Sequence, residues 1–362
     1  MQAKNLCFYL SDHGFGHIAR NIPLIAEAVR RIDAYVYVVC GERHLEFAKA
    51  NLLEILTPEQ SSRIRYRAEH TDIGLILQQG TLLVDTSALT DACAQYLAEL
   101  PERAKQEAEW LRQQEIAAAL CDMPLWSISA CEQAGVPLLY VGNFTWTELY
   151  REFLPEYIWK AYAAEYRKIQ HGVLYALHNP EMLEFLPRAE LSATSLVARP
   201  FHPDEIRTIR ARHTCPVVFV ALGMSAQFTR PVSVEGVEAH FYVTEGVPLT
   251  GSNVTVIPYS TLHTQDYVAA ADYVITKAGW GTVAECLLAQ KPMALFARDS
   301  VLEDRTTIRK LEQKKLGTKV TYEQLTEMSD LLEQMKQITY PAVPEYHNAA
   351  AEIVSKLLTL TE

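Results

Sequence analysis

Short apolar runs alternate with amphipathic stretches along this chain of 362 residues, and this alternation restricts its fold more than any other feature. The run Leu6–Leu10 is followed by a helical pattern over 18–31 and then by Ala34–Cys40, which is rich in β-branched and aromatic residues. Strand, helix and strand in this order form a βαβ unit, whose parallel strands are covered by helices on both faces. The sequence therefore predicts an α/β fold.

The same alternation occurs in both halves of the chain, and four prolines between Pro180 and Pro203 separate the two. Further strand-like runs lie at 116–121, 136–142, 216–223, 240–244, 253–258, 272–277 and 292–297. Because a chain of this length favours two domains, we expect four segments. They are an N-terminal Rossmann-like domain (1–180), a linker (181–203), a C-terminal Rossmann-like domain (204–340) and an amphipathic helix (341–362) that could pack back on the N-terminal domain.

Composition excludes several classes of protein. The net charge of -11 argues against a nucleic-acid partner, which needs a basic surface. No apolar run is long enough to span a bilayer or to form a signal peptide, so we expect a cytoplasmic protein, with peripheral membrane contact left open. The seven cysteines are odd in number and contain no CxxC pair, which predicts buried free thiols rather than disulfides or a zinc site. The oligomeric state is not predicted.

The first glycine-rich loop, "SDHGFGHIAR", follows the first predicted strand. Gly14, Gly16 and Ala19 fit the G-x-G-x-x-A pattern of dinucleotide sites, with Glu42 near the place of a ribose-binding acid. A glycine turn at a helix N-terminus suits any anionic ligand, because free N–H groups and the helix dipole meet there. A dinucleotide site, another phosphate ligand and a purely structural turn therefore all remain open.

The residues around these glycines favour acid–base catalysis over dinucleotide binding. Ser11 and Asp12 separate the strand from the first glycine, which a dinucleotide site would place directly after the strand. His13 and His17 are not needed for NAD, whereas an imidazole titrates near neutral pH and suits proton transfer.

Two loops of the second half repeat the strand-to-glycine transition. In "KAGWGTVAE" we expect the helix to open with Thr282, so that Glu285 either completes a capping box or accepts hydrogen bonds from a ribose diol. In "ALGMSAQ", Gly223 and Ser225 follow another strand. The three loops together suggest a ligand held between the two halves.

At this point the sequence resembles a known family. Residues 269–305 look like the donor-binding region of GT-B glycosyltransferases, as in the peptidoglycan N-acetylglucosaminyltransferase and the UDP-glycosyltransferases, and "GFGHIARNIPL" is similar to their N-terminal loop. "HGFGHIAR", "CDMPLWSISACEQAGVPLLYVGNFTW" and "KAGWGTVAECL" are more similar to the glycosyltransferase-like N-terminal half of plant arabinokinases and its stand-alone bacterial relatives. The resemblance implies a GT-B fold, with two Rossmann-like domains whose parallel sheets face each other across a cleft. Kinase activity is not carried over, because the sequence has no GxxxxGK[ST] motif.

The resemblance also implies roles for individual residues. His17 matches the loop histidine that removes the acceptor's proton, Asp122 matches its carboxylate partner 105 residues later, and His13 is an alternative base. Asn143 and Trp146 are candidates for the acceptor side, with core packing as the alternative for Trp146. The positions that correspond to donor contacts are Gly14, Gly16, Gly223, Ser225, Ile257, Pro258, Gly279, Gly281, Thr282, Glu285, Asp304 and Arg305. Thr306 and Thr307 replace the expected glutamines, which leaves the donor sugar open.

We therefore expect an inverting hexosyl- or N-acetylhexosaminyltransferase that uses a nucleotide-sugar, with UDP as the expected nucleotide, and an unknown acceptor hydroxyl. The nucleotide-sugar is a substrate, and no cofactor is expected. No metal is expected either, since there is no DxD pair and no metal-binding spacing among His44, His70, His202, His213, His240 and His263. The alternatives are a UDP-N-acetylglucosamine 2-epimerase-like enzyme, an NAD-dependent oxidoreductase and a non-catalytic sugar-nucleotide-binding protein.

Overall fold

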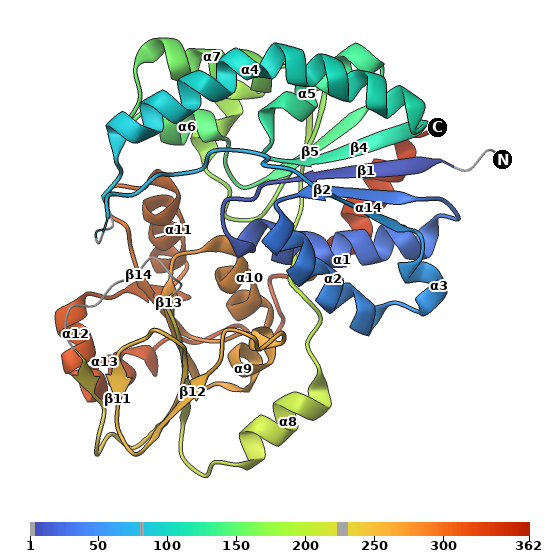
Figure 1. The fold of residues 1–362 in the computed structure, drawn as a ribbon. Coiled ribbons are helices and arrows are strands. Elements are labelled where there is room, and N and C mark those ends of the chain that lie inside the picture. The colour runs from blue at the N-terminus through green and yellow to red at the C-terminus, as the bar shows by residue number, and fades with distance from the viewer. Residues whose placement is uncertain (1–3, 80, 82, 223–230) are drawn as a thin grey trace. The chain divides into compact units, whose positions relative to one another are not determined.

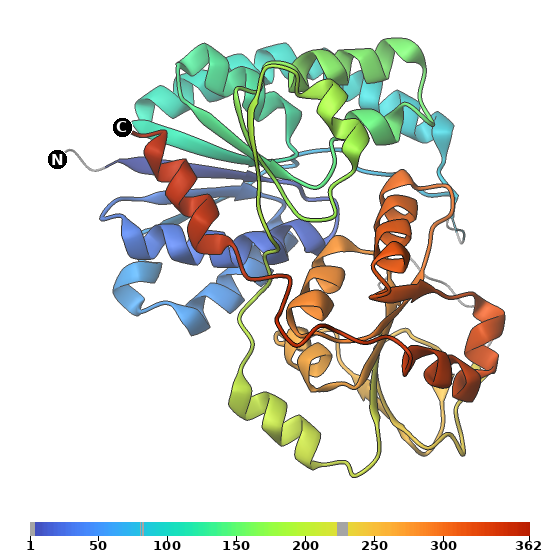
Figure 2. The ribbon, with the colours of Figure 1, turned by 180° about the vertical axis from the view of Figure 1, so that it is seen from behind.

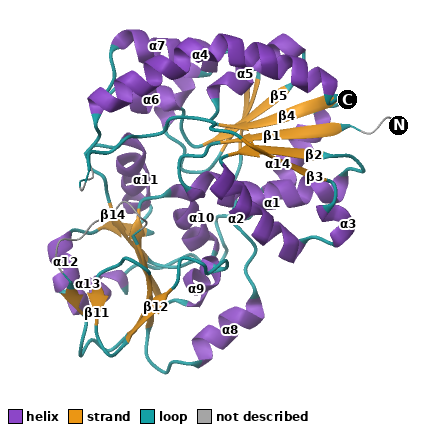
Figure 3. Cartoon of the chain, in the orientation of Figure 1, coloured by secondary structure: helices purple, strands orange, loops and turns teal. Residues whose placement is uncertain are grey.

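The computed structural model describes the chain except residues 1–3, 80, 82 and 223–230 (Figure 1). It divides into two compact units. Unit 1 comprises residues 1–76, 84–197 and 348–362, and unit 2 comprises residues 77–83 and 198–347. Each unit contains a parallel sheet with helices around it, so the α/β prediction is confirmed for both halves (Figure 3).

Unit 1 is built on a seven-stranded parallel sheet in the order β3-β2-β1-β4-β5-β6-β7. The strands are β1 (Asn5–Leu10), β2 (Val36–Cys40), β3 (Ile64–Ala68), β4 (Ile116–Asp122), β5 (Leu138–Gly142), β6 (His171–Leu174) and β7 (Glu190–Ala193). The strand order reverses between β1 and β4, which pair up to Leu10 and Asp122. The carboxyl ends of such a pair form a topological switch point, where open α/β sheets bind ligands.

Helices cover both faces of this sheet, as the two ribbon views show (Figures 1 and 2). On one face, α1 (Phe15–Arg31) packs against both α2 (Glu42–Ile55) and the C-terminal α14 (Ala350–Thr359). On the other face, α5 (Leu125–Ala134) packs against α4 (Thr86–Gln113) and α7 (Glu156–Tyr166). The shorter helical segments of unit 1 are α3 (Pro58–Ser61), α6 (Trp146–Tyr150) and the 3-10 helix η1 (Pro180–Phe185).

The proline-rich stretch differs from the linker expected over 181–203. Its first part contains most of η1 and all of β7, whose residues Glu190 to Ala193 pair in register with His171 to Leu174 of β6. Its last residue, Pro203, begins α8. The chain passes from one unit to the other at 197–198. Prolines at N1 of η1 and α8 therefore begin helices here, which is a position that proline favours.

Unit 2 has a six-stranded parallel sheet in the order β12-β10-β8-β13-β14-β15, with its switch point between β8 and β13. Its strands are β8 (Val217–Ala221), β10 (His240–Thr244), β12 (Val254–Ile257), β13 (Tyr273–Lys277), β14 (Met293–Phe296) and β15 (Gly317–Lys319), and β9 (Val232–Ser233) pairs with β11 (Leu249–Thr250) in a small second sheet. Its helices are α8 (Pro203–Ala211), α9 (Thr264–Ala270), α10 (Trp280–Leu288), α11 (Leu302–Gln313), α12 (Tyr322–Thr326) and α13 (Met328–Met335).

All seven cysteines are free, and six of them are buried, as expected. Among the described residues, no helix combines the length and apolar character that crossing a membrane requires.

Candidate functional site

The loop after β1 places three polar side chains inside unit 1. Gly14 precedes α1 with a φ of 82°, a conformation that glycine adopts without strain. Since α1 begins at Phe15, His17 lies in its first turn, and Arg20 and Asn21 follow three and four residues later on the same face. All three are buried, although they are polar. Such side chains need partners, and they find them at the end of β4.

Asp122, the last residue of β4, lies within hydrogen-bond distance of all three side chains. Its Oδ1 lies 2.9 Å from His17 Nδ1 and 2.5 Å from Arg20 Nη2. Its Oδ2 accepts from Arg20 Nε at 2.7 Å and from Asn21 Nδ2 at 2.6 Å. Arg20 therefore holds the carboxylate with two N–H donors, Nε and Nη2, in a bidentate geometry, which is strong for this pair.

This network keeps Asp122 ionised. Burial by itself would raise the pKa of the carboxyl, but the Arg20 and His17 charges and hydrogen bonds outweigh it, so the pKa lies below its ordinary value. An anionic Asp122 can orient an imidazole and stabilise the imidazolium that forms when His17 takes a proton.

The tautomer of His17 decides whether it can act as a base, and two groups compete for its Nδ1. If Nδ1–H donates to Asp122, Nε2 keeps a lone pair and can accept a proton. Arg20 Nη2 also lies 3.0 Å from the same Nδ1. If Nδ1 accepts from Arg20 instead, Nε2 carries the hydrogen and cannot be the base.

His13, the alternative base, takes part in a different set of contacts. Its Nε2 accepts a hydrogen bond from the Leu75 backbone N–H at 3.4 Å, and its ring packs edge-on against Trp146. The ring lies so close to Gly74 that a Cβ there would be 1.9 Å from its Nδ1. His13 thus supports the chain around Gly74, whereas His17 has the carboxylate contact that a base requires.

The two residues expected on the acceptor side, Asn143 and Trp146, are both internal, each with 2% of its surface exposed. Asn143 Oδ1 accepts from Arg20 Nη1 at 2.8 Å, which extends the Asp122 network to the end of β5. The Trp146 indole N–H donates to Asp72 Oδ2 at 2.9 Å. Both residues therefore support the site from within, which for Trp146 corresponds to the core-packing alternative.

Sequence reasoning missed three residues of this region. Arg20 and Asn21 were detectable in principle, because they lie three and four residues after His17 on a predicted helix. Asp72 was not, since the sequence analysis predicted neither a strand nor a glycine loop just before it. It is buried, and burial together with the Asp12 charge raises the pKa of its carboxyl to about 6. Ser11 Oγ donates to Asp72 at 3.0 Å, so this second carboxylate lies beside the same loop.

In unit 2, the loop after β13 begins a helix that differs from the expected one. Helix α10 starts at Trp280 with Gly279 as its N-cap, and no side chain caps it. The capping-box alternative for Thr282 and Glu285 is therefore wrong, because the helix has already begun before Thr282. Glu285 lies in the second turn, and its Oε1 accepts from Arg199 Nη2 at 3.1 Å.

Arg199 fixes Glu285 and also binds the segment before α9. Its Nη1 donates to the Leu262 carbonyl at 2.6 Å, and its Nη2 donates to Thr264 Oγ1 at 3.1 Å. Burial raises the pKa of the Glu285 carboxyl, and the Arg199 charge opposes this shift.

The remaining donor-side candidates in unit 2 are mostly engaged within the unit. The Ile257 and Pro258 carbonyls accept from the Glu245 and Thr261 backbone N–H groups at 2.9 and 3.0 Å. Asp304 is buried and accepts three hydrogen bonds from Arg298, while Arg305 donates to the Asp299 carbonyl at 2.9 Å. Two further candidates, Gly223 and Ser225, lie outside the described residues.

The space beside the glycines differs between the two loops. A Cβ added at Gly14 or Gly16 would meet no atom within 4 Å, so the backbone there is open on that side. At Gly279 it would lie 3.3 Å from Lys277 Cε. Lys277 ends β13, and burial and the Arg298 charge lower the pKa of its amine. Gly281 and Thr282 fall in the first turn of α10.

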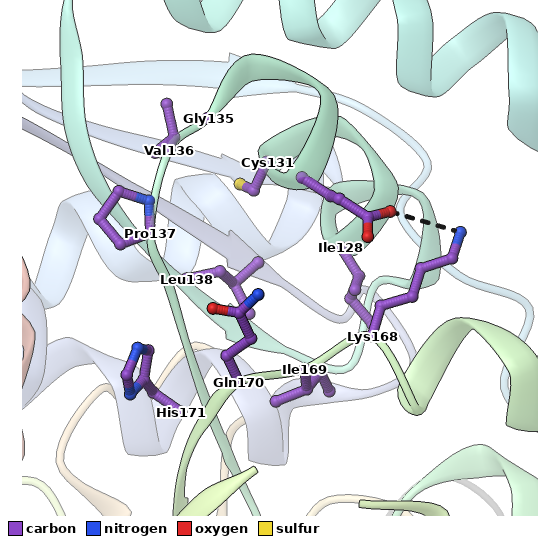
Figure 4. Close-up of a pocket in the computed structure, with 11 residues that line it drawn as sticks. Ile128, Cys131, Gly135, Val136, Pro137, Leu138, Lys168, Ile169, Gln170 and His171 are labelled. Carbon is purple, nitrogen blue, oxygen red and sulfur yellow. Dashed lines mark ion pairs between the residues drawn. The ribbon is translucent and has the colours of Figure 1, made fainter. Parts of the chain in front are cut away.

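A cavity of about 280 Å³ lies elsewhere in unit 1 (Figure 4). Cys131, Lys168 and His171 are among its lining residues, and it opens where β5 and β6 begin. Asp122 lies at the carboxyl end of β4, the opposite end of the same parallel sheet. This cavity is therefore separate from the His17 and Asp122 pair.

Comparison with known proteins relates both units to glycosyltransferases. Residues 227–360 match the glycosyltransferase family 28 C-terminal domain. Over 326 residues, 83% of this chain, the sequence is 26% identical to the L-arabinokinase of Arabidopsis thaliana, of which it spans 29%.

Solved structures match over the whole chain. The UGT89C1 of Arabidopsis thaliana, in complex with UDP-L-rhamnose, superposes with a TM-score of 0.67 at 12% identity and 100% coverage of both chains. The calicheamicin glycosyltransferase CalG4 gives 0.60 at 14% identity, covering 100% of this chain and 94% of its own. The UGT73P12 of Glycyrrhiza uralensis gives 0.58 at 14% identity, covering 100% and 91%.

The chain has the GT-B fold.

This identification confirms the fold and the resemblance on which the sequence analysis relied. The two loops also occupy equivalent positions in their sheets. The β1 to α1 loop and the β13 to α10 loop each follow a strand at the switch point of a GT-B sheet.

Proposed function

We propose that this GT-B protein is an inverting glycosyltransferase in which His17 is the general base. The observation that carries the proposal is the 2.9 Å contact between His17 Nδ1 and the buried Asp122 carboxylate at the switch point of unit 1. A glycosyltransferase family 28 C-terminal domain over residues 227–360 supports the same reaction class.

In the proposed reaction, His17 Nε2 removes the proton from an acceptor hydroxyl, and the oxygen attacks the anomeric carbon of the donor. The bond from that carbon to the diphosphate oxygen breaks as the new glycosidic bond forms, so the configuration inverts. Asp122 fixes the His17 tautomer and balances the imidazolium charge. His13 is the second residue to test as the base.

We further propose that unit 2 holds the donor as a UDP-sugar. The N-terminus of α10, with Gly279, Gly281 and Thr282, and the Lys277 amine would bind the diphosphate. Glu285 would accept hydrogen bonds from the ribose, with Arg199 holding its Oε1 in place. UDP is the first nucleotide to test. Two structurally similar glycosyltransferase structures, 12% and 10% identical to this chain, are complexes with UDP-L-rhamnose and UDP-2fluoro-glucose. The sugar and the acceptor are to be identified by screening.

The first experiment separates donor binding from chemistry. UDP should raise the melting temperature of the wild-type protein, since a ligand that binds the folded state stabilises it by mass action. Glu285→Gln should weaken this response, whereas His17→Ala should leave it unchanged. If neither UDP nor another nucleoside diphosphate shifts the melting temperature, the donor site is misassigned, and a response to NADH alone would favour the oxidoreductase.

The second experiment measures UDP release from UDP-sugars with an acceptor library. We expect His17→Ala to lower the rate by about 10²–10⁴-fold, the usual contribution of a general base. His171→Ala, at the other end of the sheet, should keep wild-type activity and serves as the control. Normal turnover by His17→Ala would reject this base assignment. An altered sugar formed from the donor alone would identify an epimerase instead, and UDP binding without any turnover would identify a non-catalytic binding protein.

A further inference from the structure

Three side chains that bind metals well meet in unit 2, beside the segment that Arg199 links to Glu285. His202 precedes α8, His263 precedes α9, and Asp266 lies in the first turn of α9. One nitrogen or oxygen atom from each lies within 4.8 Å of the other two. The sequence analysis missed this group because 61 residues separate the two histidines, so no short spacing motif marks it.

The group is arranged around a buried carboxylate. Asp266 Oδ1 accepts from the His202 backbone N–H at 2.9 Å, and its Oδ2 lies 2.8 Å from His202 Nδ1. The His202 and His263 rings are 4.5 Å apart between centroids and inclined by 65°. Asp266 is fully buried, whereas both histidines are partly exposed, so an ion from solvent could reach the group.

The surrounding hydrogen bonds hold the two contributing segments together. Arg199 donates to the Leu262 carbonyl and to Thr264, on either side of His263. The Gln265 side chain donates to the Pro200 carbonyl at 3.1 Å. The segment before α8 is therefore fastened to the segment before α9 independently of any ion, which preorganises the three side chains.

Gln265 also contains an atom whose usual partner is missing. The residue is only 1% exposed, yet its Oε1 has no hydrogen-bond partner among the described residues. Its orientation is set by the Pro200 carbonyl, which can only accept, so the amide nitrogen must face it. The same nitrogen lies 3.4 Å from His263 Nδ1, beside the group. A buried acceptor without a donor calls for a partner such as an ordered water or a metal-bound water.

We propose that His202, His263 and Asp266 form a binding site for a divalent transition-metal ion, with Zn²⁺ as the first candidate. Two imidazole nitrogens and one carboxylate oxygen are a ligand set that Zn²⁺ uses, with water in the fourth position. Small side-chain rotations bring the three atoms to ligand distance, and Asp266 Oδ2 exchanges its contact with His202 Nδ1 for the ion. None of the three side chains has a role in the proposed sugar transfer, so metal binding can be tested independently of that proposal; the site would be an exception to the expectation of no metal.

The test measures metal binding by the purified full chain, with no assay of transfer. The protein is stripped with a chelator and dialysed against Zn²⁺, and Co²⁺ is used as a spectroscopic probe. We expect one Zn²⁺ per chain and Co²⁺ absorption bands typical of nitrogen and oxygen ligands. His263→Gln and Asp266→Asn should each weaken Zn²⁺ binding by about tenfold or more.

A matched control is available in the same unit. His213 and His240 also stack, with ring centroids 3.9 Å apart, and His240→Gln should leave Zn²⁺ binding unchanged. Because Asp266 supports the local fold, Asp266→Asn could fail to fold, in which case His263→Gln decides the question alone. No Zn²⁺ binding by the wild type, unchanged binding by His263→Gln, or a Co²⁺-thiolate band that places the ion at a cysteine would each overturn the proposal.

Discussion

At the scale of single residues, the charge balance around Asp122 is the most informative feature of unit 1. One carboxylate serves two cationic partners, since Arg20 is always charged and His17 becomes charged when it accepts a proton. Arg20 therefore orders the carboxylate, and its charge helps to keep that carboxylate ionised. We infer that Arg20 is a positioning residue whose removal affects both stability and the pH dependence of the site.

Replacing Arg20 with Met should destabilise the fold by about 3–5 kcal/mol at neutral pH, because a buried carboxylate loses its main partner. The lowered pKa of Asp122 means that its ionisation stabilises the wild-type fold above the ordinary value of 3.8. That contribution is lost as the pH falls below 3.8 towards the lowered pKa of the folded state. The cost of Arg20→Met should therefore be smaller at pH 3 than at pH 7, as measured by urea unfolding.

The control for this prediction is Arg151→Met. Arg151 pairs with Glu181 and Glu184 at the surface, with 32% of its side chain exposed. Such a pair contributes about 0–1 kcal/mol. An equal cost of Arg20→Met at both pH values would mean that Arg20 acts by packing and not through the charge of Asp122.

At the scale of elements, α6 shows how a short helix that follows β5 is stabilised inside unit 1. Thr145 and Glu148 form a capping box, in which Glu148 Oε1 accepts from the Thr145 N–H at 2.7 Å. Glu148 is fully buried, and this burial raises the pKa of its carboxyl to about 8, although the Thr145 hydrogen bonds oppose the shift. The folded state is therefore most stable when Glu148 is protonated, because the effect of burial outweighs that of the capping hydrogen bonds.

The pKa of Glu148 leads to a prediction about pH. Between its ordinary value of 4.5 and about 8, the folded state binds more protons than the unfolded state, so stability falls as the pH rises. Glu148→Gln keeps the capping geometry and cannot ionise, so the variant should gain roughly 2–4 kcal/mol on the wild type between pH 5 and pH 8. Urea unfolding at both pH values measures this difference. Glu109→Gln, at an exposed position of α4, is the control, and a constant difference across the pH range would contradict the prediction.

At the scale of the whole molecule, unit 1 is completed by the last residues of the chain. The Ala349 N–H donates to the Leu196 carbonyl at 2.8 Å, and α14 then packs against α1 (Figure 2). Its buried face consists of Ile353, Val354 and Leu357. Residues that follow unit 2 in the sequence thus belong to unit 1.

Leu357→Ala should therefore destabilise unit 1 by about 2–5 kcal/mol, the cost of a large core truncation. Tryptophan fluorescence can follow this unfolding, since Trp110, Trp126, Trp146 and Trp159 are four of the five tryptophans and lie in unit 1. Leu53→Ala, on α2 with 58% of the residue exposed, should cost far less. Equal effects of the two variants would show that α14 is not needed by unit 1.

The predicted linker shows where a sequence pattern does not determine the structure. Strand-like runs and glycine loops depend on neighbouring residues, so the central strands of both sheets and the β1 to α1 loop were predictable from the sequence pattern. The outer strands β3, β6, β7 and β15 were not predicted. The prolines around η1 and α8 suggested a linker, because proline breaks helices and strands in isolation. In the folded chain, Pro180 and Pro203 begin helices, and β7 between them completes the sheet.

The sequence by itself determined that the chain forms two α/β halves with glycine loops after their strands, and resemblance added the pairing of His17 with Asp122. Local backbone preferences and apolar periodicity are properties of neighbouring residues, so they can be read along the chain. Only the tertiary structure decided which distant groups meet. It brought Arg20 to Asp122, Arg199 to Glu285, and His202 to His263 and Asp266. Such contacts depend on the register of parallel strands and on the packing of helices far apart in sequence, which no local pattern encodes.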